Sequence, residues 1–185
     1  MPSPKKYTAE DFINWEQYQL LFKEITVPAK TTLLREGEVS KKAYYIKKGC
    51  LRIWFNNNGK DVTFQFFFEE QGVSSMESFR TQQPSLFSIE SIEPCTLWVI
   101  SKKNFDLMVT SIPRYNDFLR DVLYKRLEHY AKLFLSRIKD TPQKRYEDLL
   151  QNNPEIIQRV PQHYIASYLG ITPVSLSRIR NKILR

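Results

Sequence analysis

The groups best suited to specific chemistry in this chain lie near its C-terminus. Residues 161–185 contain no Asp or Glu. The last eight residues hold four basic side chains, Arg178, Arg180, Lys182 and Arg185. Guanidinium and ammonium groups pair with phosphate, and short polar side chains beside them can hydrogen-bond the edges of bases. This residue set therefore points to nucleic-acid binding.

A glycine and a proline divide the same stretch into two short helices. Ile165 and Leu169 have the spacing of one apolar helix face, and Gly170 is expected to end that helix. Thr172 then caps a second helix whose first residue is Pro173. Two short helices joined by a tight turn predict a helix-turn-helix.

The second helix has an apolar stripe and a polar face. We expect Leu176, Ile179 and Ile183 to be buried, Ser175 and Arg178 to contact bases, and the other basic residues to contact phosphate. A solvated basic helix without a nucleic-acid partner is the alternative. The candidate DNA-binding residues are Thr172, Pro173, Val174, Ser175, Ser177, Arg178, Arg180, Lys182 and Arg185.

The net charge of +8 is unevenly distributed along the chain. Residues 1–110 carry 14 Lys/Arg and 13 Asp/Glu, whereas residues 111–185 carry 14 Lys/Arg and only 7 Asp/Glu. A basic half attached to a neutral half favours nucleic-acid binding, although a basic surface would also suit a membrane face or solubility alone.

The elements before this basic unit follow from hydrophobic spacing. Apolar residues at steps of three and four predict a helix or helix pair over residues 8–25. Short β-rich runs separated by turns over residues 27–105 predict an antiparallel sandwich or jelly roll, with a hairpin at Asn58-Gly59. Cys50 and Cys95 both fall in such runs, where buried, reduced thiols are expected.

Helical spacing returns after Pro113 and persists for about 25 residues. The apolar stripe is wide enough to pack on the sandwich and on a second copy of the helix, but a helix packed only within its own chain is also possible. A break is expected at 139–142, where Thr141 or Asp140 can cap another helix that has Pro142 at its first position. The candidate dimer residues are Leu119, Val122, Leu123, Leu127, Tyr130 and Phe134.

The predicted fold class is therefore α+β. An N-terminal double-stranded β-helix, or jelly roll, forms a sensor domain (1–112). A dimerisation helix (113–138) joins it to a helix-turn-helix DNA-binding domain (139–185).

The motifs resemble those of the Crp/Fnr transcription regulators along nearly the whole chain. "KTTLLREGEVSKKAYYIKKGCLRIW" and "NNNGKDVTFQ" are similar to the opening strands of that family's cyclic-nucleotide-binding jelly roll, and "YIASYLGITPVSLSRIR" is similar to its helix-turn-helix. The resemblance implies a homodimeric regulator whose partners are double-stranded DNA, a second copy and RNA polymerase.

The chain departs from the cyclic-AMP-binding members at the phosphate-binding cassette. Those members have Gly-Glu-Leu followed by Arg-Ser/Thr-Ala, whereas here Ser85 stands at the start of the second motif. Arg80 could substitute for the missing arginine, and Leu86 and Phe87 could fill the pocket instead. We expect no control by cyclic AMP, and either another effector or none. The candidate effector-pocket residues are Glu77, Ser78, Arg80, Gln82, Gln83 and Ser85.

The second helix of the helix-turn-helix departs as well. The commonest family pattern supplies Arg-Glu-Thr in its first turn, where this chain has Pro173, Val174 and Ser175. Loss of the glutamate removes an acceptor for cytosine, so the operator is expected to differ from the best-known one.

Two other classes of function are weighed against a regulator. Jelly rolls also host metal-dependent enzymes, but His129 and His163 both lie in helical segments outside the strands, so no catalysis, metal or cofactor is expected. Two cysteines cannot supply the four thiolates of an iron-sulfur cluster. A nucleotide- or protein-binding regulatory module without specific DNA binding remains the alternative. With no membrane span or signal peptide in the sequence, a cytoplasmic location is expected.

Overall fold

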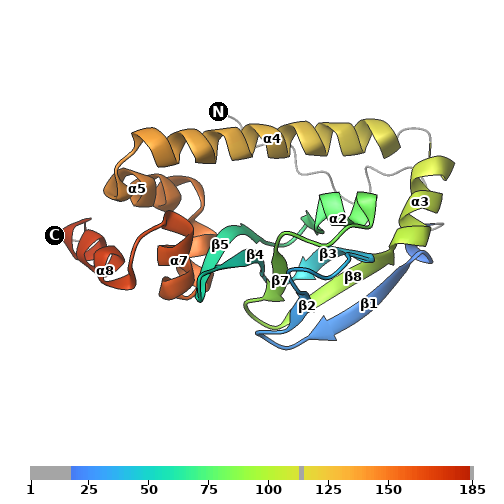
Figure 1. Ribbon diagram of the computed structural model, residues 1–185, viewed down its shortest axis with the longest axis horizontal. Coiled ribbons are helices and arrows are strands. Elements are labelled where there is room, and N and C mark those ends of the chain that lie inside the picture. The colour runs from blue at the N-terminus through green and yellow to red at the C-terminus, as the bar shows by residue number, and fades with distance from the viewer. Residues whose placement is uncertain (1–17, 113–114, 184–185) are drawn as a thin grey trace. The chain divides into compact units, whose positions relative to one another are not determined.

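The computed structural model describes residues 18–112 and 115–183 (Figure 1). These residues form two compact units. The first unit runs to Phe55 and resumes at Gln65, and it contains most of the strands. The second unit consists of Asn56–Phe64, which is the end of a β-hairpin, together with the helices from Tyr115 onward.

The strands form two four-stranded sheets, in the orders β1-β8-β3-β6 and β2-β7-β4-β5. The recorded pairings are antiparallel. The strands are β1 (Phe22–Val27), β2 (Thr32–Leu34), β3 (Lys42–Lys48), β4 (Leu51–Asn57), β5 (Lys60–Phe67), β6 (Gly72–Val73), β7 (Ser88–Ser91) and β8 (Cys95–Ser101).

The core of the first unit lies between these sheets, because side chains alternate along each strand. Tyr44 and Ile46 are buried on β3, as are Leu51 and Ile53 on β4. All four belong to one hydrophobic cluster, to which Leu97 of β8 also contributes. The sequence-based prediction of a β-sandwich of jelly-roll type is confirmed.

The hairpin between β4 and β5 turns at Asn58 and Gly59, as predicted. Both residues have positive φ, at 52° and 84°. Left-handed conformations at both central positions match the right-handed twist of a two-residue hairpin, which explains the choice of asparagine and glycine.

The helix predicted for residues 8–25 does not extend to its expected end. Phe22 and Ile25 lie in β1, where they pair with Ile100 and Leu97 of β8. A ladder of six residues outweighs the helical spacing of the apolar side chains, because each paired residue satisfies its backbone groups. The part of this prediction that covers residues 8–17 falls outside the described residues.

The helices belong to both units. Those of the first unit are α2 (Met76–Thr81) and α3 (Lys102–Ser111). Those of the second unit are α4 (Tyr115–Lys139), α5 (Pro142–Asn152), α6 (Pro154–Arg159), α7 (Gln162–Leu169) and α8 (Pro173–Ile183).

The predicted break after the long helix is confirmed. The helix α4 ends at Lys139, and the Thr141 hydroxyl accepts a hydrogen bond from the backbone N–H of Lys144 at 3.2 Å. Pro142 then occupies the first turn of α5, where it needs no hydrogen-bond acceptor. Cys50 and Cys95 both hold buried thiols, as expected.

Candidate nucleic-acid interface

The helices α7 and α8 form the predicted helix-turn-helix within the second unit (Figure 1). Gly170 ends α7 in the left-handed region, with φ of 69°. The backbone N–H of Ile171 donates to the carbonyl of Ala166 at 2.9 Å. This closure satisfies a terminal carbonyl of α7 and turns the chain sharply toward α8.

The start of α8 is fixed by Thr172. Its hydroxyl accepts a hydrogen bond from the backbone N–H of Ser175 at 3.1 Å and lies 2.9 Å from the Ser175 hydroxyl. Pro173 occupies the first helical position. Both start signals predicted from the sequence are therefore present in the structure.

The inner side of α8 packs against the rest of the unit. Leu176 is fully buried, and Ile179 and Ile183 are half-buried. On the partner helix α7, Ile165 and Ala166 are buried as well. The apolar stripe predicted for α8 is thus the side that it buries.

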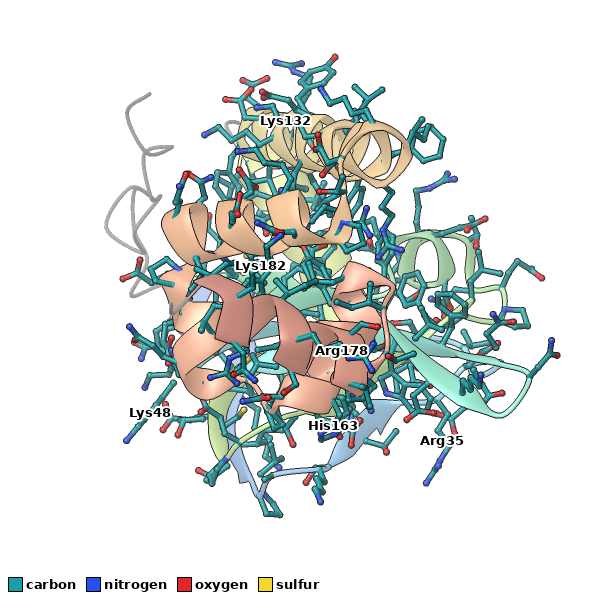
Figure 2. The ribbon with its side chains drawn as sticks, turned by 90° about the vertical axis from the view of Figure 1, so that its left-hand side faces the viewer. Arg35, Lys48, Lys132, His163, Arg178 and Lys182 are labelled. Atoms are coloured by element: carbon teal, nitrogen blue, oxygen red, sulfur yellow. The ribbon has the colours of Figure 1, made fainter. Side chains whose placement is uncertain are left out.

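The outer side of α8 is a continuous exposed face without a carboxylate. Its members recur at steps of three, four and one, so they share one side of the helix. Figure 2 labels two of them, Arg178 and Lys182, on α8. This face, called the α8 outer face below, consists of Val174, Ser177, Arg178, Asn181 and Lys182.

Two predicted contact residues lie beside this face. Ser175 is half-buried, and its hydroxyl is already hydrogen-bonded to Thr172. Arg180 is half-buried as well. Arg185 lies outside the described residues. Sequence reasoning missed Asn181, which lies three residues after Arg178, because an asparagine in a short helix carries no distinctive pattern.

Two arginines from neighbouring helices hold the C-terminal end of α7. Arg137 of α4 donates through Nη2 to the carbonyl of Tyr168 at 2.6 Å. Arg145 of α5 donates through Nη2 to the carbonyl of Leu169 at 3.0 Å and through Nη1 to that of Asp140 at 2.7 Å. Cations at a helix C-terminus also offset its dipole. These arginines therefore have structural partners within the unit.

Burial raises the pKa of Tyr168, the buried tyrosine of α7, to about 12, with Arg137 acting in the opposite direction. Tyr168 is therefore neutral at physiological pH. Its role in α7 is packing, since 9% of its surface is exposed.

The end of the β4–β5 hairpin also packs on α7. The Ser167 hydroxyl donates to the carbonyl of Asp61 at 2.9 Å and accepts from the backbone N–H of Thr63 at 2.9 Å. The ring of Phe64 lies 5.1 Å from that of Tyr130 on α4. Strands β4 and β5 therefore extend from the first unit into the second, where their end contributes to the packing of α7 and α4.

One side of α4 carries large apolar side chains that remain exposed among residues 18–112 and 115–183. Tyr124, Leu127, Phe134 and Ile138 are 63–69% exposed. With Ala131, which is also exposed, they recur at steps of 3, 4, 3 and 4. This heptad spacing is the pattern of a coiled-coil contact. We call these five residues the α4 stripe.

The candidate dimer residues are divided by this stripe. Leu127 and Phe134 belong to it, and Leu123 beside it is 45% exposed. Leu119, Val122 and Tyr130 are half-buried. The candidate dimer residues of α4 therefore fall into a half-buried set and an exposed set. Of the two sets, the exposed one is available for contact with a second copy of the helix.

The candidate effector residues lie on and after α2 in the first unit. Ser78 and Ser85 are buried, whereas Glu77, Arg80, Gln82 and Gln83 are exposed. The backbone N–H of Ser40 donates to the Ser78 hydroxyl at 2.9 Å. The Ser85 hydroxyl donates to that of Ser75 at 2.8 Å. The structure thus uses both buried serines to tie α2 to its own surroundings.

The two residues that follow Ser85 point to different environments. Phe87 is half-buried and packs against the core cluster of the sandwich. Leu86 is 69% exposed, so only Phe87 of the two fills interior space.

His163 and His129 both lie on helices of the second unit. Partial desolvation lowers the pKa of His129, and Arg126 and Lys132 lower it further.

Within residues 18–112 and 115–183, no group of His, Cys, Asp and Glu is arranged to hold a metal ion. In the same part of the chain, no helix has both the length and the apolar character needed to cross a membrane.

Residues 24–111 match the family model of the cyclic nucleotide-binding domain. No curated protein matches the chain. A double mutant of CooA from Carboxydothermus hydrogenoformans is 17% identical, with a TM-score of 0.73 over 93% of this chain and 80% of that one. The c-di-GMP-responsive global regulator CLP of Xanthomonas campestris is 18% identical, with a TM-score of 0.71 over 91% and 89%.

A protein from Eubacterium rectale, assigned to the Crp/Fnr family of transcriptional regulators, is 16% identical, with a TM-score of 0.74 over 98% of this chain and 88% of that one. Residues 24–111 are therefore similar to a cyclic nucleotide-binding domain. The chain as a whole has the fold of the Crp/Fnr transcriptional regulators, and the resemblance noted in the sequence is confirmed.

Proposed function

We propose that the protein is a homodimeric, sequence-specific DNA-binding regulator of transcription that is not controlled by cyclic AMP. The observation that carries this proposal is the α8 outer face. An exposed helix face with two cations and no carboxylate, on the second helix of a helix-turn-helix, has the shape and charge that fit the major groove.

The composition of the α8 outer face supports specific binding. Arg178 can hydrogen-bond both acceptors of a guanine, and Asn181 can hydrogen-bond an adenine. Lys182, near the end of the helix, has the reach to contact a phosphate. Its Nζ lies 3.2 Å from the side-chain oxygen of Gln143, which is a neutral partner. A face with groups for both bases and phosphates favours a specific complex over a merely basic surface.

The α4 stripe supports a dimer. Its heptad spacing is self-complementary, so a second copy of α4 is the partner that would bury it. Two copies would present two α8 helices to successive major grooves, about 34 Å apart, on a near-palindromic site. Dimerisation also doubles the number of phosphate contacts and so strengthens DNA binding.

The cassette around α2 supports the absence of cyclic AMP control. A buried cyclic phosphate needs a guanidinium or several amides, and the position of the family arginine is held by Ser85, whose hydroxyl is hydrogen-bonded to Ser75. Arg80 is exposed, not directed into the core. CLP, which shares the fold, is a c-di-GMP-responsive regulator, so the fold accommodates signals other than cyclic AMP.

The proposed mechanism acts through the break between α4 and α5. Arg137 and Arg145 connect α4 and α5 to the end of α7. A change in the packing of α4 against its copy would therefore move the helix-turn-helix and alter the spacing of the two α8 helices. RNA polymerase is a further candidate partner of such a regulator, and the cytoplasm is the compartment where it would act.

A second candidate function is a nucleotide- or protein-binding regulatory module without specific DNA binding. The match of residues 24–111 to the cyclic nucleotide-binding domain favours it. This second candidate does not explain the α8 outer face, because a module of that kind needs no basic helix-turn-helix.

The test is selection of DNA from a random duplex pool by the full chain without added effector, followed by affinity measurements over a range of salt concentrations. We expect a two-fold symmetric site to be enriched and its affinity to fall steeply as salt rises. Enrichment of no sequence, with and without a panel of cyclic nucleotides and c-di-GMP, would favour the second candidate.

A further inference from the structure

Val174 is the one large apolar side chain on the α8 outer face. It is 61% exposed, whereas Leu176 two residues later is 1% exposed. A single exposed valine is not by itself informative. The position of Val174 is informative, because it is the second residue of α8. The N-terminal residues of such a helix are those that contact base edges.

The neighbours of Val174 define what it can contact. Ser177 and Arg178 follow it by three and four residues and are exposed on the same face. If Arg178 contacts a base edge, Val174 faces the same groove about one turn closer to the start of the helix. The side chain has no hydrogen-bonding group, so it can recognise only an apolar group in that groove.

We propose that Val174 contacts the C5-methyl group of a thymine, so that each half of the operator has a required T·A pair at that position. This inference rests on the proposed function. Thymine is the only one of the four bases with a methyl group in the major groove. The valine would also disfavour cytosine there, because it would cover the N4 amino donor and offer no acceptor.

Deoxyuridine is the probe that isolates this contact, because it differs from thymidine only by the missing methyl group. Each conserved thymine of the selected site would be replaced by deoxyuridine in turn, and the affinity of the full chain measured. Burial of one methyl group predicts about a fourfold loss when one half-site is substituted, and roughly fifteenfold when both are.

The variant Val174→Ala should lose this preference and bind the thymidine and deoxyuridine sites about equally. The matched control Leu86→Ala, which truncates an exposed apolar side chain of the first unit, should keep the wild-type difference. Alanine favours helix, and both positions are exposed, so neither variant is expected to unfold the protein. Thermal unfolding of both variants checks this.

The inference is overturned if no thymine of a specifically bound site is sensitive to loss of its methyl group. It is also overturned if Val174→Ala keeps the wild-type sensitivity. In both cases a specific site has been bound, and the proposed function stands. Absence of any enriched site would overturn the proposed function and this inference with it.

Discussion

Truncation of Leu127 on the α4 stripe should weaken the proposed dimer without affecting the fold of the monomer. The side chain is 64% exposed in the isolated chain, so it contributes little to the stability of the monomer. In a coiled-coil contact along the stripe, it would be buried against the same residue of the second copy. The variant Leu127→Ala therefore tests which side of α4 forms the contact.

The size of the effect follows from the exposed fraction. Complete burial of a leucine side chain contributes about 1.5–3 kcal/mol, so burial of the exposed part contributes roughly 1–2 kcal/mol per copy. Alanine retains some of this, and the dimer contains two copies. We expect the dimer dissociation constant to rise roughly 30- to 150-fold, which corresponds to about 2–3 kcal/mol.

Sedimentation equilibrium over a dilution series measures this dissociation constant. The matched control is Leu86→Ala in the first unit, which removes the same side chain from a position that is 69% exposed. The control should dimerise as the unmodified protein does. The reasoning is refuted if Leu127→Ala dimerises normally, or if both variants weaken the dimer equally.

Three further perturbations test the packing of each unit. In Gly49→Ala the new Cβ would lie 2.5 Å from the sulfur of Cys95, at a backbone φ of +108°. Urea unfolding should therefore show that the free energy of unfolding falls by more than about 3 kcal/mol. A decrease of less than about 1 kcal/mol would contradict this geometry. Arg145→Ala removes hydrogen bonds to two carbonyls at 2.7 and 3.0 Å, and about 2–3 kcal/mol of unfolding free energy should be lost from the second unit; unchanged unfolding would show that solvent replaces them. Burial raises the pKa of Tyr44 and Tyr168 to about 12, so the native state keeps protons that the unfolded chain loses above pH 10. Stability should be full below pH 10 and fall as the pH rises through about 12. Replacement of either tyrosine by phenylalanine should reduce this loss of stability at high pH. An unaltered pH profile in both variants would contradict the role given to the two buried tyrosines.

The local signals of the helix-turn-helix could be predicted from the sequence. Gly170 ends α7 and Thr172 caps α8 because the conformation of a glycine and the hydroxyl of a cap act over a few residues. The apolar stripe of α8 follows from helical spacing for the same reason. The break before α5 rests on a cap of the same kind, at Thr141.

Features that depend on distant partners could not be predicted. Phe22 and Ile25 have helical spacing, but pairing with β8, more than 70 residues away in the chain, makes them a strand. On α4, apolar residues occur on more than one side, and only the packed structure leaves Ile138 exposed and Tyr130 half-buried. The same limit applies to α8, where only the packed structure shows that Ser175 is half-buried and Asn181 exposed.

The central claim is that the α8 outer face recognises a DNA sequence, and the most direct test is a competition assay on the selected site. The variant Arg178→Ala/Lys182→Ala should lose discrimination between this site and random duplex. The control Arg35→Ala/Lys48→Ala removes two exposed cations from the first unit and should keep it (Figure 2). Retention of discrimination by the α8 variant, or an equal loss in both, would contradict the claim.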